Sequence, residues 1–263
     1  MAVHSTYQPN TAARRAVTAG HATWSKTLAV AASRLVLFAA FQALIALLFW
    51  AGGKIDPWQS SVAFWPWSFT LANFASIVLL TRLLRSDGLR LADLYRSGDH
   101  KIWRELLLVI AVFVLAGPIA WLPNTGLAAL LFGDSMTATR MMFLPLPDWA
   151  LYPVMLLFPV SVALAELPTY FGYVMPRLEA LSGKTWAAVG LAAFALAAQH
   201  IAAPLIFDGR YLLWRLLMFL PFALYVGIVI RLRPGLLPYL MIGHGIIDFG
   251  TIMTVWMASR GML

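Results

Sequence analysis

Of the eleven acidic residues and five histidines in this sequence, four lie well inside long apolar stretches: Glu166, His200, His244 and Asp248. Such residues in a membrane usually face a protein interior or a water-filled cavity and serve a function, because a charge at that depth is costly. A buried carboxylate can act as general base towards a water molecule, and an imidazole can orient that water or donate to a developing oxyanion. The same groups can also ligate zinc. These four residues are therefore our candidate catalytic residues, for either metal-free or zinc-assisted hydrolysis.

The spacing of two of these residues predicts a shared helical face. His244 and Asp248 are four residues apart, so both side chains point into the same space on a helix. Gly243 and Gly245 flank the histidine and leave room for a neighbouring helix or a substrate. Two structural alternatives remain open: Asp248 could only hold His244 in an interhelical hydrogen bond, and His200 could be a core histidine bonded to a backbone carbonyl.

Glu166 lies in a segment that interrupts regular helix geometry. Pro168 and Gly172 follow it closely and are expected to loosen the helix just beyond the carboxylate. No residue adjacent in sequence neutralises Glu166, which favours a functional role over a purely structural one.

The composition places these residues in a membrane protein. Of the 263 residues, 61% are hydrophobic and only 11% are charged, whereas soluble domains are about 25% charged. A water-soluble domain is therefore excluded. The chain also has no cysteine, which excludes disulfides, thiolate catalysis and cysteine-ligated metal sites.

Apolar stretches recur along the chain between charged or Pro/Gly-rich breaks, and each is long enough for a helix that crosses a bilayer. We predict an all-α polytopic membrane helix bundle with about seven transmembrane helices. The predicted spans are 28–52, 61–81, 106–123, 149–176, 185–205, 211–230 and 235–258. Residues 124–148 form a longer external segment that could re-enter the bilayer or cap a cavity.

The distribution of basic residues predicts the orientation. With the N-terminus cytoplasmic, fourteen of the nineteen Lys and Arg residues fall on the cytoplasmic side, as the positive-inside rule requires. Arg34 and Arg177 are counted in this set, and Arg215 is counted on the opposite side. The net charge of +8 is thereby explained, and we expect the lipid bilayer rather than nucleic acid as a partner.

The run from Glu166 to Glu179, ELPTYFGYVMPRLE, followed by His200 and then by His244 and Asp248 in HGIID, resembles the CPBP (Abi) family of intramembrane proteases. That family includes the type II CAAX prenyl proteases and bacteriocin-processing or immunity proteins. Its motifs are typically Glu-Glu-x-x-x-Arg-Gly, then Phe-x-x-x-His, then His-x-x-x-Asn/Asp, each on a different late helix. The resemblance covers roughly residues 150–255.

The resemblance implies a glutamic intramembrane endopeptidase of a bacterial cell membrane. Glu166 would activate the hydrolytic water with His200, while His244 and Asp248 would stabilise the oxyanion. The implied substrate is a peptide or a membrane-anchored protein, no cofactor is expected, and zinc stays open. The chain then divides into a disordered cytoplasmic tail over 1–26, N-terminal transmembrane helices and loops over 27–148, and a CPBP-like catalytic helix core over 149–263.

Three positions depart from the family pattern. Leu167 stands where the second Glu is typical, Phe171 replaces the arginine, and Leu196 replaces the phenylalanine. Without that arginine, Glu166 is expected to lack its usual charge partner. The departures fit either a divergent enzyme or a non-proteolytic member that uses the cavity for bacteriocin immunity or partner binding. A transporter with a Glu–His proton relay is a third alternative, although no internal repeat is evident.

The predicted depths of Glu166 and His200 differ. Counted from Arg177 and Lys184, they lie roughly 16 Å and roughly 24 Å into the membrane at 1.5 Å per helical residue. A separation beyond about 8 Å between the carboxylate and the imidazole would count against this water-activating pair, because hydrogen-bond reach requires closer groups.

Overall fold

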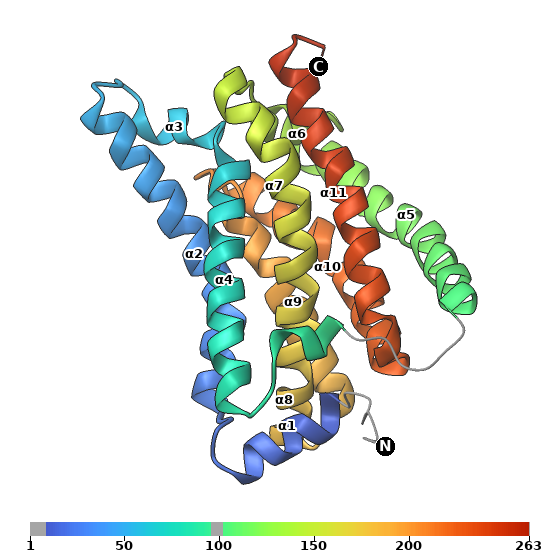
Figure 1. Cartoon of the computed structure of the whole chain (residues 1–263). Coiled ribbons are helices and arrows are strands. Elements are labelled where there is room, and N and C mark those ends of the chain that lie inside the picture. The colour runs from blue at the N-terminus through green and yellow to red at the C-terminus, as the bar shows by residue number, and fades with distance from the viewer. Residues whose placement is uncertain (1–8, 96–101, 263) are drawn as a thin grey trace.

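The computed structural model describes residues 9–95 and 102–262, and over these residues it contains helices and no strands. Seven helical spans are long and apolar enough to cross a membrane, which confirms an all-α polytopic membrane helix bundle (Figure 1). The main helices of these spans are α2 (Trp24–Ala51), α4 (Trp65–Ser86), α5 (Ile102–Phe132), α7 (Asp148–Leu167), α9 (Thr185–Gln199), α10 (Gly209–Leu232) and α11 (Leu237–Ser259). The shorter helices are α1 (Pro9–Thr18), α3 (Pro57–Val62), α6 (Thr137–Met142) and α8 (Met175–Ser182), with 3-10 turns at Leu91–Tyr95, His200–Ala202 and Pro234–Leu236.

The largest difference from the predicted spans is in α5. We predicted 106–123, whereas the helix runs from Ile102 to Phe132 with Pro118 and Pro123 inside it. Membrane helices tolerate an internal proline when neighbouring groups satisfy the freed backbone carbonyl. The predicted external segment 124–148 is therefore partly helix, and only residues 133–136 and 143–147 are irregular.

The prediction of a disordered tail over residues 1–26 is wrong for residues 9–26. Helix α1 buries Ala12, Ala13 and Ala16 and contacts α8, because small residues four apart form a stripe that packs closely. Helix α2 then begins at Trp24, with the Thr23 side chain capping it. Residues 1–8 lie outside the described residues.

A π-helical stretch follows the candidate glutamate. Residues Pro168–Val174 join α7 to α8, so that one helical rod runs from Asp148 to Ser182. The proline lacks an N–H and cannot continue the regular ladder, which explains the looser winding immediately after Glu166. The rod ends at Gly183, whose φ of 67° places it in the left-handed region that favours glycine.

The apolar core consists of two clusters that meet at the level of the candidate residues. The first is mainly aliphatic and includes Leu80, Leu84, Leu178, Ala192 and Val226. The second is largely aromatic and includes Phe38, Trp65, Phe69, Phe158 and Trp214. Along α7, Val162 belongs to the aromatic cluster and Leu167 to the aliphatic one, so Glu166 lies at their boundary. His200 lies in the same way between Leu196 and Ala202.

Candidate active site

The carboxylate of Glu166 is the centre of a buried polar network, and the side chain is 1% exposed. Nε2 of His244 lies 3.0 Å from Oε1, and Nε2 of Gln199 donates to Oε2 at 2.7 Å. The guanidinium of Arg34 approaches the same Oε2 to 3.5 Å. Three different helices thus supply an imidazole, an amide and a cation to one carboxylate.

The His200 ring is oriented by its own helix. Its Nδ1 lies 2.9 Å from the carbonyl oxygen of Leu196, and a carbonyl can only accept, so Nδ1 carries a hydrogen. In the neutral ring, Nε2 then keeps its lone pair. The ring also stacks on Phe219, with centroids 3.6 Å apart. Nδ1 thus makes the backbone hydrogen bond expected of a core histidine. Nε2 makes no hydrogen bond within the described residues and can still accept a proton.

The carboxylate of Glu166 and the imidazole of His200 are closer than the limit of about 8 Å stated for a water-activating pair. Nε2 of His200 lies 4.0 Å from Oε2 of Glu166. This distance is too long for a direct hydrogen bond, but it allows one water molecule to bond both atoms.

The expected difference in depth does not exist, because the hairpin between these residues turns at Gly183. The helix continues past Arg177, which is 1% exposed and pairs with Asp87 instead of marking the end of the span. Glu166 lies seventeen residues before Gly183 and His200 seventeen residues after it. The two side chains are therefore level in the bundle.

His244 and Asp248 share one face of α11, as their spacing predicts. Nε2 of His244 lies 3.4 Å from Oδ2 of Asp248 in addition to its contact with Glu166. Within the part of the chain that the structure describes, His244 Nδ1 and Asp248 Oδ2 have no hydrogen-bond partner. Both atoms therefore keep bonding capacity.

The glycines beside His244 allow close approach by other helices, as expected. A Cβ at Gly245 would lie 3.0 Å from the Pro159 carbonyl oxygen of α7. A Cβ at Gly243 would collide with the ring of Phe113 on α5. These contacts let α11 carry His244 close to Glu166.

Three residues of this network were not identified from the sequence: Arg34, Gln199 and Tyr170. Arg34 was assigned to the cytoplasmic set, which is wrong: its side chain is fully buried, and its Nε donates to Gln199 Oε1 at 2.6 Å. The Tyr170 hydroxyl donates to the same oxygen at 3.1 Å. The only signal in the sequence was this arginine within the predicted span 28–52, close to its start.

The expectation that Glu166 lacks a charge partner is also wrong. Phe171 stands at the family's arginine position and is buried in the aliphatic cluster, as is Leu167. Arg34 reaches the carboxylate from α2 instead. The cation is thus supplied by a different helix, and apolar packing replaces the typical Glu and Arg.

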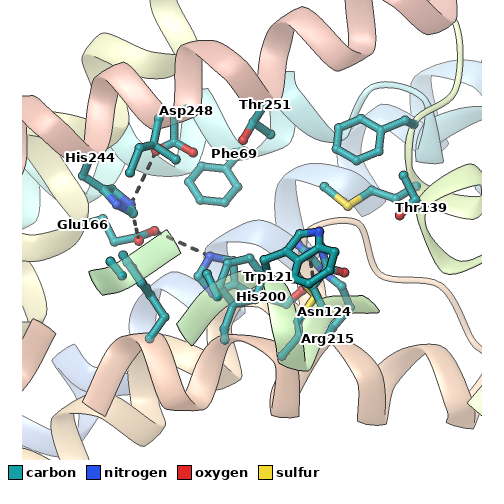
Figure 2. A pocket seen from close by; sticks show the side chains of 18 of the residues that line it. Phe69, Trp121, Asn124, Thr139, Glu166, His200, Arg215, His244, Asp248 and Thr251 are labelled. Carbon is teal, nitrogen blue, oxygen red and sulfur yellow. Dashed lines mark hydrogen bonds and ion pairs between the residues drawn. The ribbon is translucent and has the colours of Figure 1, made fainter. Parts of the chain in front are cut away.

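A cavity of about 590 Å³ opens beside the network. Glu166, His200, His244 and Asp248 all line it, so the structure brings the four predicted residues to one space (Figure 2). The rest of the lining is mostly apolar and comes from α4, α5, α7, α10 and α11. Thr139, Met142 and Phe143 also line it, which supports the capping alternative for the segment after α5.

Within residues 9–95 and 102–262, no group of three His, Cys, Asp or Glu side chains has an arrangement that could hold a metal ion. Glu166 already accepts hydrogen bonds at both oxygens, and the two imidazoles approach different oxygens of it.

No protein-family model, no curated protein sequence and no solved structure matches this chain. The function therefore has to be inferred from the geometry of the site.

Proposed function

We propose that this integral membrane protein is an intramembrane peptidase, a divergent relative of the CPBP-type glutamic endopeptidases of bacterial cell membranes. It would hydrolyse a peptide bond of a membrane-associated peptide or protein with water activated between Glu166 and His200. The observation that carries this proposal is the 4.0 Å gap between His200 Nε2 and Glu166 Oε2 at the wall of a largely apolar cavity. A water in this gap would touch the bound substrate and both groups.

The hydrogen bonds around the gap favour His200 as the acceptor of the water proton. Oε2 of Glu166 already accepts from Gln199 and faces Arg34, whereas His200 Nε2 has no hydrogen bond within the described residues. The hydroxide would add to the carbonyl carbon while the proton passes to His200. Glu166, 4.0 Å away, would stabilise the imidazolium that forms.

The second half of the reaction returns this proton. The imidazolium of His200 would protonate the leaving nitrogen as the C–N bond breaks, giving a carboxylic acid and an amine. When His244 is protonated, its Nδ1–H has no partner in the described part of the chain and is free to donate to the oxyanion. Asp248 would stabilise that charged form of His244 from 3.4 Å.

Cleavage of membrane-anchored peptides by the purified protein in lipid nanodiscs tests this proposal. Mass spectrometry of the products should show hydrolysis at one bond, and Glu166→Gln and His200→Ala should each slow it by about 10²–10⁴-fold. His21→Ala, which changes an exposed histidine, is the control and should cleave normally. Cleavage that neither substitution affects would refute the assignment. Activity lost to a chelator and restored by zinc would replace it with a metal mechanism.

One observation favours a second function, in which the cavity binds a partner without hydrolysis. Three donors already surround the Glu166 carboxylate, and a saturated carboxylate is a weaker base. In that case no peptide of the panel would be cleaved. Saturable binding of a panel member, unchanged by His200→Ala, would then support immunity or partner binding.

A further inference from the structure

Three arginines are fully enclosed within the described residues, and one of them differs from the others. Arg34, Arg177 and Arg215 are each at most 2% exposed. The first faces Glu166 and the second pairs with Asp87. No carboxylate of the described chain lies within 4.0 Å of Arg215, which the sequence had placed at the outer surface. An enclosed cation normally has an anionic partner, because removal from water is costly.

The donors of Arg215 are only partly used. Its Nε donates to the carbonyl oxygen of His200 at 3.1 Å, and its Nη2 donates to the carbonyl oxygen of Ala203. The remaining nitrogen, Nη1, reaches only the sulfur of Met218 at 4.0 Å. A thioether is a weak acceptor. The two carbonyls fix the guanidinium in position, and the rings of Trp214 and Phe219 lie 5.6 and 4.9 Å from its central carbon. These neutral groups leave the guanidinium without an anionic partner among the described residues and Nη1 without a strong acceptor.

The position of Arg215 links it to the proposed reaction centre. Its side chain lines the same cavity as Glu166 and His200, and it is bonded directly to the His200 backbone. Figure 2 shows Arg215 on the same side of the pocket as His200, with Asp248 and Thr251 opposite. Most of the other lining side chains are aromatic or aliphatic.

We propose that Arg215 is a carboxylate-binding site, and that the cavity takes an apolar ligand carrying one carboxylate. The guanidinium would accept the carboxylate through Nη1, as a charge-assisted hydrogen bond. The binding site itself does not require hydrolysis. Its role in aligning a substrate carbonyl beside His200 rests on the proposed function.

Matched pairs of acid and neutral ligands test the site directly. The probes are N-dansyl-phenylalanine with its amide and dansylamino-undecanoic acid with its methyl ester, added to the full chain in phosphatidylcholine nanodiscs. Trp65, Trp121 and Trp214 line the cavity and are donors for energy transfer to the dansyl group. Each acid should bind about ten- to a hundredfold more tightly than its neutral partner, the usual range for a hydrogen bond to a charged group. The pair that binds more tightly shows whether the carboxylate belongs to a peptide or to a lipid.

Substitutions then assign the preference to one residue. Arg215→Gln should abolish the acid preference, and Arg215→Lys should keep part of it. Arg210→Gln is the matched control: it removes an exposed arginine of the same helix and should leave the preference unchanged. Equal binding of acid and neutral probe by the unmodified protein would overturn the proposal, as would a preference that survives in Arg215→Gln. The first of these outcomes does not depend on whether a variant folds.

The same probes separate this proposal from the peptidase proposal. Glu166→Gln removes an anion from the cavity wall, so the acid preference should persist or increase. A protein that cleaves nothing but prefers the acids would lose the peptidase assignment and keep the carboxylate site. Cleavage without any acid preference would support the peptidase assignment and overturn the carboxylate site.

Discussion

The two sides of Glu166 are built differently. On the side of α2, the amide of Gln199 joins Arg34, Tyr170 and the carboxylate in a network with donor–acceptor distances between 2.6 and 3.1 Å, in which only Nη1 of Arg34 has no partner among the described residues. On the side of α5, His200 and His244 line a cavity, and His200 Nε2 and His244 Nδ1 have no hydrogen bond within the described residues. The network fixes the carboxylate and does not line the cavity through Arg34 or Gln199, whereas the unpartnered imidazole nitrogens belong to residues that do line it, so we expect ligands to bind on the α5 side.

Loss of Arg34 should have the largest effect on stability. In Arg34→Met the enclosed carboxylate of Glu166 loses its cation, and breaking such a pair typically costs about 3–5 kcal/mol. Unfolding in detergent at increasing denaturant should show this loss. Because no unpaired carboxylate would remain, the double variant Arg34→Met/Glu166→Gln should recover much of it. Arg215→Met, on the cavity side, removes a cation that has no carboxylate partner and should cost less. An Arg34→Met variant as stable as the unmodified protein would remove the distinction between the two sides.

The sequence predicted the parts of this arrangement that depend on local pattern. Seven spans follow from apolar stretches of sufficient length, and the shared face of His244 and Asp248 follows from their four-residue spacing. The contact of Arg34 with Glu166 joins positions 132 residues apart. No local rule predicts such a contact, and an arginine near a span end has the pattern of a topology signal. Gln199 is uncharged, so nothing distinguished it within an apolar helix.

Substitution of two glycines tests, with smaller losses of stability, whether the aliphatic core is packed more closely than the cavity side. A Cβ at Gly227 would lie 2.8 Å from Cε1 of Phe171, a ring that is 1% exposed and enclosed in the aliphatic cluster. Gly227→Ala should therefore cost about 1–3 kcal/mol, as overpacking usually does. A Cβ at Gly243 would collide with the half-buried ring of Phe113, which lines the cavity, and we expect this ring to yield into that space.

We expect Gly243→Ala to lose less stability than Gly227→Ala. We also expect it to reduce cleavage and probe binding, which depend on the cavity, more than Gly227→Ala does. Thermal unfolding and dansyl-probe titration of both variants measure the two effects. The reverse order of stability would show that the α5 side is as closely packed as the core.

The smallest effect concerns the start of α10, the helix that carries Arg215 and Phe219 to the cavity side. Asp208 caps this helix, and its Oδ1 accepts from the backbone N–H groups of Arg210 and Tyr211 at 2.8 and 3.0 Å. Asp208→Ala should cost about 1 kcal/mol, as the loss of such a cap usually does. Asp208→Asn keeps an acceptor and is the matched control.

The same cap predicts a pH dependence. The backbone hydrogen bond from Tyr211 is the main cause that lowers the pKa of the Asp208 carboxyl below its ordinary value of 3.8. The folded state therefore holds the ionised form more strongly than the unfolded state does, so this stabilisation is present above pH 3.8 and declines as the pH falls towards the lower folded-state pKa. The difference between Asp208→Ala and the unmodified protein should accordingly be larger at pH 7 than at pH 3. An equal difference at both values would show that the cap does not depend on the charge of Asp208.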